Sequence, residues 1–148
     1  MRDYEDYDRS CQSIREENAK LLDDFESWLI RKNLTETTAI RHCRNIDFYI
    51  NEFLLYEGPR RPADGVNDVG LFLGYWFIRK AMWANQTSIK ANAASLKKFY
   101  DFMAERGEVD RSHVNAMKGK IKNELPEWLA TMRRYDDPSI DMEDVWPW

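Results

Sequence analysis

The chain has 148 residues, of which 43% are hydrophobic and 32% charged, and its net charge is −4. This length and apolar content suit one domain with its own core, and they exclude a disordered or collagen-like chain. The longest apolar run is shorter than the roughly 20 residues of a membrane span, and the polar start shows no secretory leader. We therefore expect a cytoplasmic protein without membrane contact, with two reduced cysteines and a single disulfide as the alternative.

The acidic residues are concentrated at the two ends of the chain. Residues 1–19 hold six acidic against three basic residues, and residues 136–148 hold five acidic residues and no basic one. The stretch between them, 20–135, is therefore basic overall, with 19 basic and 15 acidic residues. Because phosphate binding depends on local charge, the overall negative charge does not exclude nucleic acid as a partner.

Hydrophobic periodicity predicts two helices in the first half of the chain. The first covers residues 20–31, and a break at 33–35 separates it from a second over 38–55, with Thr35 and Thr38 as its N-terminal cap. Gly58 and the prolines that follow end the second helix.

The second half continues this helical pattern. A third helix is predicted from residue 67 or 68 to about 82, and a fourth from Thr87 to Arg106, ended by Gly107. A short helix over 112–123 and a last one beginning at Pro126 complete the pattern. The prediction is an all-α bundle of four main and two minor helices over 17–135, flanked by acidic tails at 1–16 and 136–148.

The sequence contains no recognisable catalytic or metal-binding motif. Its two histidines, His42 and His113, lie in different predicted helices, and no HExxH or phosphate-binding glycine loop occurs. His42 falls on the apolar side of the second helix, which favours a core or boundary histidine over a ligand. Its neighbour Cys43 is best explained as a packed thiol. We therefore predict no enzyme activity of its own, no metal and no cofactor.

Two predicted helices carry basic residues away from their apolar stripes, where they could contact the phosphates and major groove of double-stranded DNA. An ordinary solvated surface is the alternative explanation for the same pattern. On the second helix these candidate residues are Arg41 and Arg44, with Asn45 beside them, and on the fourth they are Thr87, Lys90, Lys97 and Lys98.

The order of the motifs adds a resemblance. Residues 34–42 followed by Phe53 and Leu54 resemble the first half of the core-binding domain of tyrosine recombinases, the phage integrases. Residues 85–90, 95–103 and 106–107 are similar to the fourth helix of that domain. The resemblance covers about residues 17–110 and implies a four-helix, SAM-like domain that clamps DNA, with its second and fourth helices near the major groove.

The sequence also departs from the family pattern. His42 stands where tyrosine is common, and the usual asparagine-proline pair after the last glycine is replaced by residues 110–113. The catalytic arginine, HxxR motif and nucleophilic tyrosine have no counterpart, since residues 42–44 read only HxR. The resemblance therefore implies a non-catalytic DNA-binding module involved in DNA integration and recombination.

Two alternatives concern the acidic ends. A helical protein-interaction domain that does not bind DNA would use the C-terminal tail with Trp146 and Trp148 as a partner site. In another arrangement, this tail covers the basic residues and competes with phosphate. A continuous positive surface joining the second and fourth helices would favour DNA binding, and interruption by Glu36, Asp47 or Asp101 would count against it.

Overall fold

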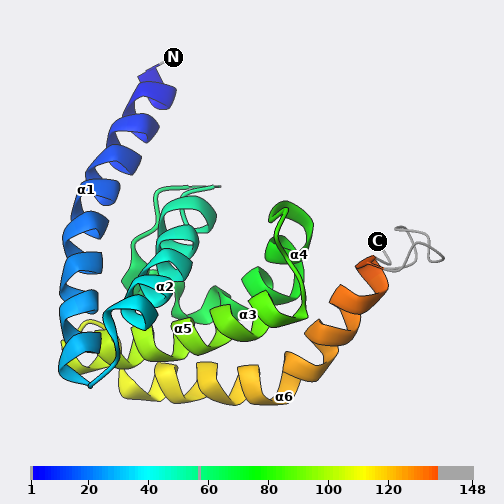
Figure 1. Ribbon diagram of the computed structural model, residues 1–148. Helices are drawn as coiled ribbons and strands as arrows, with labels where there is room; N and C mark the ends of the chain where they lie inside the picture. Colours follow the sequence, from blue (N-terminus) through cyan, green and yellow to red (C-terminus); the bar gives the residue numbers. More distant parts are fainter. Residues whose placement is uncertain (1, 57, 137–148) are drawn as a thin grey trace.

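The protein is all-α in the computed structural model, which describes residues 2–56 and 58–136 and contains no strand in those ranges. Two long helices, α1 and α6, lie at the ends of the chain, and shorter helical segments lie between them (Figure 1). In chain order the elements are α1 (Arg2–Arg31), α2 (Glu36–Asp47), η1 (Phe48–Phe53), η2 (Pro62–Asp68), α3 (Val69–Leu71), η3 (Phe72–Trp76), α4 (Phe77–Lys80), α5 (Gln86–Glu105) and α6 (Arg111–Asp136).

Short polar side chains begin the two central helices. Thr35 caps α2, because its hydroxyl oxygen accepts a hydrogen bond from the Thr38 amide at 3.2 Å. At the start of α5, Asn85 and Ser88 each accept a hydrogen bond from the other's backbone amide, at 2.8 Å in both cases. This reciprocal capping box satisfies two amides that have no partner within the helix.

Left-handed residues end α1 and α5 in the same way. Asn33 has φ of 70° and Gly107 has φ of 78°, a conformation that glycine and asparagine adopt more readily than other residues. After α5, the amide of Glu108 bonds to the carbonyl of Met103 at 3.0 Å, which closes a Schellman turn. The predicted end of this helix at Gly107 is confirmed.

The central helix α5 packs between α2 on one side and α6 on the other. Figure 1 shows α6 running alongside α5 in the opposite direction, while α1 packs against α2 at the far end of the molecule. The second and fourth predicted helices, which correspond to α2 and α5, are therefore direct neighbours.

Aromatic side chains fill the core beside these helices. Phe72 is fully buried and contacts several other rings, among them Tyr49 at 4.8 Å and Phe53 at 5.1 Å between ring centroids. The buried hydroxyls of Tyr49 and Tyr100 donate to the carbonyls of Gly65 and Pro62, at 2.6 and 2.9 Å. Burial raises the pKa of both phenols, so they stay protonated and connect η2 to η1 and α5.

The first helix is much longer than predicted. It begins at Arg2 instead of residue 20, so the residues assigned to an acidic tail at 1–16 continue α1 from Arg2 onward. Three of them, Tyr7, Cys11 and Ile14, form a small cluster with Leu55, and the Tyr7 hydroxyl donates to the Leu55 carbonyl at 2.5 Å.

The last helix also differs from the prediction. Pro126 lies inside α6 and does not begin a separate helix, so the two predicted minor helices are one. A proline within a helix removes one backbone hydrogen bond and bends the axis. Figure 1 shows such a bend in α6. The C-terminal half of α6 then follows η3, where Trp128 lies against Gly74.

Candidate nucleic-acid interface

A buried serine is at the centre of the polar contacts between α2 and α5, which we call the seam: His42, Asn45 and Ser95. Ser95 on α5 receives a hydrogen bond from the Asn45 amide at 3.0 Å, and its hydroxyl oxygen lies 2.7 Å from Nδ1 of His42. The Ser95 hydroxyl also donates to the carbonyl of Ala91 at 3.0 Å. Since one hydroxyl proton cannot serve two acceptors, the arrangement that satisfies all these groups places a proton on His42 Nδ1.

Contacts at the two ends of α2 give the relative direction of the two helices. Lys32, shortly before α2, pairs with Glu105 at the end of α5 at 3.8 Å. Phe48, directly after α2, contacts Trp83, shortly before α5, with the ring centroids 5.0 Å apart. The two helices therefore run in roughly opposite directions.

Both predicted arginines of α2 lie on its outer side. His42 and Asn45 mark the side of α2 that faces α5. Arg41 and Arg44 each come one residue earlier, so each is turned by about 100° around the helix axis from one of these residues. Both arginines are exposed. This places them beside the seam, on the surface.

The three predicted lysines of α5 extend this surface across the seam. Lys98 is turned by about 60° from the seam residue Ser95, and Lys90 and Lys97 follow in the same direction at about 140° and 160°, on the outer side of α5 away from α2. Lys90 is exposed, and Lys97 and Lys98 are half-buried. Because the two helices run in roughly opposite directions, the rotation that leads from Ser95 to the lysines of α5 and the rotation that leads from His42 and Asn45 to the arginines of α2 end on the same side of the helix pair. We call the resulting surface the basic face: Arg41, Arg44, Lys90, Lys97 and Lys98.

Acidic residues of α2 border the basic face on the side toward α1. Cys43 contacts the Leu22 carbonyl of α1, with the sulfur at 3.8 Å, and so marks the side of α2 that faces α1. Glu36 precedes Cys43 by seven residues and Asp47 follows it by four, so both carboxylates lie near this side. Asp47 is one turn after Arg44 and about 60° from it around the helix, so its carboxylate adjoins the basic face at this arginine, whereas Arg41 is turned further away.

The carboxylate of Asp101 does lie on the outer side of α5, but it is neutralised. Lys118 and Arg111 of α6 both donate to it, at 2.7 and 2.6 Å. Partial burial alone would favour the protonated carboxyl, yet these two donors hold the pKa of Asp101 below its usual range. The three groups together carry one positive charge, which continues the basic face toward α6.

Two of the predicted surface residues have other surroundings than expected. Asn45 was assigned to the outer side with the arginines but is half-buried, because it donates to Ser95. Thr87 is exposed in the first turn of α5, where the cap is provided by Asn85 and Ser88. The Asn-x-x-Ser pattern is a sequence signal that could have identified this cap in advance.

We expect acidification to weaken the fold through His42. Burial, together with the nearby Lys98, holds the pKa of His42 below its ordinary value of 6.5. The folded chain thus binds this proton more weakly than the unfolded chain, so stability present above pH 6.5 is lost as the pH falls through the folded pKa. Urea unfolding should show a larger loss of stability between neutral pH and about pH 5 for the wild type than for His42→Gln.

A substitution of Lys98 provides the control for the effect of its charge on the pKa of His42. In Lys98→Gln, the pKa of His42 should rise toward 6.5, which an NMR titration of the imidazole would measure directly. His113, the only other histidine, provides the second signal in the same spectra. An unchanged titration of His42 in this variant would show that Lys98 does not act on it.

The remaining reactive groups fit structural roles. Cys11 and Cys43 are both free thiols. Burial, reinforced by Glu26 and Asp23, raises the pKa of Cys43 to about 11, so this thiol stays protonated at neutral pH. Among the described residues, no cluster of histidine, cysteine and carboxylate side chains could hold a metal ion. In the same part of the chain, no helix is long and apolar enough to cross a bilayer.

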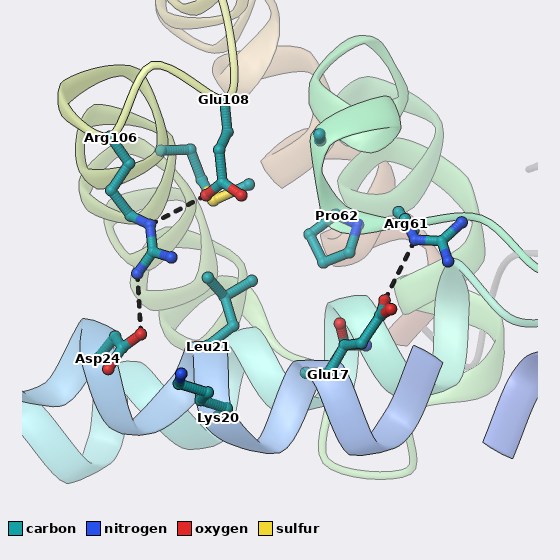
Figure 2. Close-up of a pocket in the computed structure, with 11 residues that line it drawn as sticks. Glu17, Lys20, Leu21, Asp24, Arg61, Pro62, Arg106 and Glu108 are labelled. Atoms are coloured by element: carbon teal, nitrogen blue, oxygen red, sulfur yellow. Dashed lines mark hydrogen bonds and ion pairs between the residues drawn. The ribbon is translucent and has the colours of Figure 1, made fainter. Parts of the chain in front are cut away.

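A hollow of about 400 Å³ lies between α1, the segment before η2 and the turn after α5. Figure 2 shows an ion pair on each side of it: Arg61 with Glu17 at 3.1 Å, and Arg106 bridging Asp24 and Glu108 at 2.9 and 3.0 Å. With Lys20, the lining has three basic and three acidic side chains. These charges balance, so the hollow favours neither an anion nor a cation, and the basic face remains the better candidate site.

Comparison with known proteins does not identify a family. No protein-family model matches the chain, and no curated protein or solved structure shows significant similarity to it. Trp146 and Trp148, on which the alternative prediction of a protein-interaction site depends, lie outside the described residues.

Proposed function

We propose that this protein is a non-catalytic DNA-binding module that holds double-stranded DNA on its basic face. The observation that carries the proposal is the placement of five cationic side chains, from two antiparallel packed helices, on one side of the helix pair. Of the acidic side chains nearby, Asp47 borders this surface beside Arg44, and the carboxylate of Asp101 is paired with two cations of α6. Such a surface is suited to a polyanion, since each cation near a phosphate releases condensed counterions.

The arrangement suits a duplex better than a small anion. The cations are spread over two helices instead of converging on one pocket, which suits contacts to several phosphates of one DNA backbone. The long, flexible side chains of lysine and arginine reach phosphates without reading bases, so we propose binding with little sequence preference through these five residues. On the basis of the resemblance to the core-binding domain of tyrosine recombinases, we propose that this DNA binding takes part in DNA integration and recombination.

The proposal predicts a steep salt dependence for the wild-type protein. If all five cations contact phosphates, the logarithm of the association constant should fall with the logarithm of salt concentration with a slope of about −4.5. Fluorescence anisotropy with a labelled duplex, titrated at several salt concentrations between about 50 and 200 mM, measures this slope.

Duplexes of unrelated sequence and a single strand of equal length serve as comparisons. Similar slopes for all duplexes are expected, because the contacts are to the backbone. Absence of binding at the lowest salt concentration would overturn the proposal, and a slope near zero would show that the basic face does not contact phosphates. Either result would favour the protein-interaction alternative.

A further inference from the structure

A second surface, next to the α2 side of the basic face, combines exposed aromatic and cationic side chains around the end of α4. Trp76 contacts Tyr56 at 5.8 Å and Phe48 at 5.6 Å, and Phe48 in turn contacts Trp83 at 5.0 Å between ring centroids. The ammonium of Lys80 lies 5.5 Å from the centre of the Tyr56 ring. We call this surface the Trp83 patch: Phe48, Tyr56, Trp76, Lys80, Met82 and Trp83.

The Trp83 patch exposes an unusual amount of apolar surface. Met82 is 99% exposed, and Trp83 and Tyr56 are 55% and 56% exposed. The indole N–H of Trp76 is buried with no acceptor among the described residues, which is unfavourable unless an acceptor arrives. Adjoining aromatic and apolar groups of this kind, with polar groups at their rim, mark a docking site.

The C-terminal half of α6 runs close to the elements that carry this patch. Past Pro126, Trp128 lies against Gly74 of η3, and the carbonyl of Leu129 accepts a hydrogen bond from Gln86 at 3.1 Å. The helix therefore ends beside the elements that carry the Trp83 patch. The 12 residues that follow it, 137–148, can span up to about 40 Å when extended, which is more than enough to reach the patch.

The composition of this segment complements the patch. Residues 137–148 contain four acidic residues and no basic one, together with the apolar side chains of Met142, Val145, Trp146 and Trp148. The patch offers the ammonium of Lys80 beside exposed rings, and Arg79 precedes it. We propose that residues 137–148 dock on the Trp83 patch of the same chain, with their tryptophans against its rings and their carboxylates near its cations.

Docking of residues 137–148 on the Trp83 patch does not depend on DNA binding. It also differs from the arrangement in which the same segment covers the basic face. The two arrangements make opposite predictions for two charge reversals of equal size. Docking on the Trp83 patch is weakened by Lys80→Glu, whereas covering of the basic face is weakened by Lys90→Glu. Both lysines are exposed, so neither change disturbs the core.

The test uses the full chain labelled with 5-fluorotryptophan, whose Trp146 and Trp148 signals are assigned in ¹⁹F NMR spectra of Trp146→Phe and Trp148→Phe. A soluble gadolinium chelate measures how far each indole is accessible. We expect both indoles to be protected relative to a free peptide of residues 137–148, and the protection to be lost in Lys80→Glu and in Met82→Glu. In Lys90→Glu it should persist.

Three outcomes would overturn the proposal. Indoles as accessible as those of the free peptide would show that the segment does not dock. Loss of protection in Lys90→Glu but not in Lys80→Glu would place the segment on the basic face. Protection that disappears on dilution would assign the occupant of the patch to a second copy of the chain. Because Met82 is almost completely exposed, Met82→Glu keeps the test valid even if another variant folds poorly.

Discussion

Replacing Arg44, Lys90 and Lys97 together by alanine should weaken DNA binding about 100-fold at low salt, because each exposed charge contact contributes about 1 kcal/mol. The slope of the salt dependence should also become shallower by about 2.7, since three phosphate contacts are lost. All three side chains lie at the surface or are half-buried, so the fold should be retained. Anisotropy titrations of the variant and the wild type on the same duplex provide the measurement.

A matched variant separates the basic face from the total charge. Arg15, Lys20 and Arg31 are exposed on α1, and their replacement by alanine removes the same three positive charges. This control should change binding far less than the variant of the basic face. Equal losses in the two triple variants would mean that binding follows net charge alone, and unchanged binding in the first would remove its residues from the site.

Replacing Phe72 by alanine should lower the free energy of unfolding by about 3–5 kcal/mol, the usual cost of removing a buried phenylalanine ring. The ring is fully buried in η3 and contacts Tyr49, Phe53 and Phe77, with centroids between 4.8 and 5.4 Å away. Its loss leaves a cavity that these large, rigid neighbours cannot fill. Urea unfolding followed by circular dichroism measures the effect.

The preceding residue is a natural control for this substitution. Leu71 is 56% exposed, so Leu71→Ala should change the stability by no more than about 0.5 kcal/mol. Both substitutions remove a large side chain from adjacent positions of one helical run. Similar losses for the two would show that removal of the Phe72 ring from the aromatic core does not account for the effect.

The central helices could be predicted closely because local signals surround them. The predicted helix from Thr87 to Arg106 differs from α5 by one residue at each end. Gly107 provides the left-handed residue that the turn requires, and Thr35 provides the cap of α2. These signals lie within a few residues of the element that they terminate, so no knowledge of the tertiary fold is needed.

The first and last helices show where local signals fail. The start of α1 contacts Leu55, more than 40 residues away, through side chains spaced among charged residues, and no local pattern reveals that partner. Pro126 resembles a helix start because proline favours the first turn. Inside α6 its missing hydrogen bond is tolerated while Trp128 and Met132 are buried against the rest of the molecule.

For the candidate site, periodicity could predict which side chains point outward but not which helices are neighbours. Arg41 and Arg44 are exposed as predicted. Asn45 is not, because the polar group that receives it, Ser95, lies 50 residues away on α5. A helical wheel treats a polar residue as solvent-facing and cannot anticipate a buried polar partner. The pairing of Asp101 with Lys118 and Arg111 is likewise a tertiary feature.

The two ends of α1 differ in local stability, because they make contacts of different extent with the rest of the molecule. Its C-terminal part is fixed in the main core by Phe25 and Leu29, whereas its N-terminal part is held through the small cluster around Leu55. Opening of the first turns therefore exposes little apolar area and leaves α2 and α5 undisturbed. Amide hydrogens in these turns would exchange with solvent by local fraying long before global unfolding. The first turns of α1 can therefore unfold and refold while the surface that we assign to DNA keeps its structure.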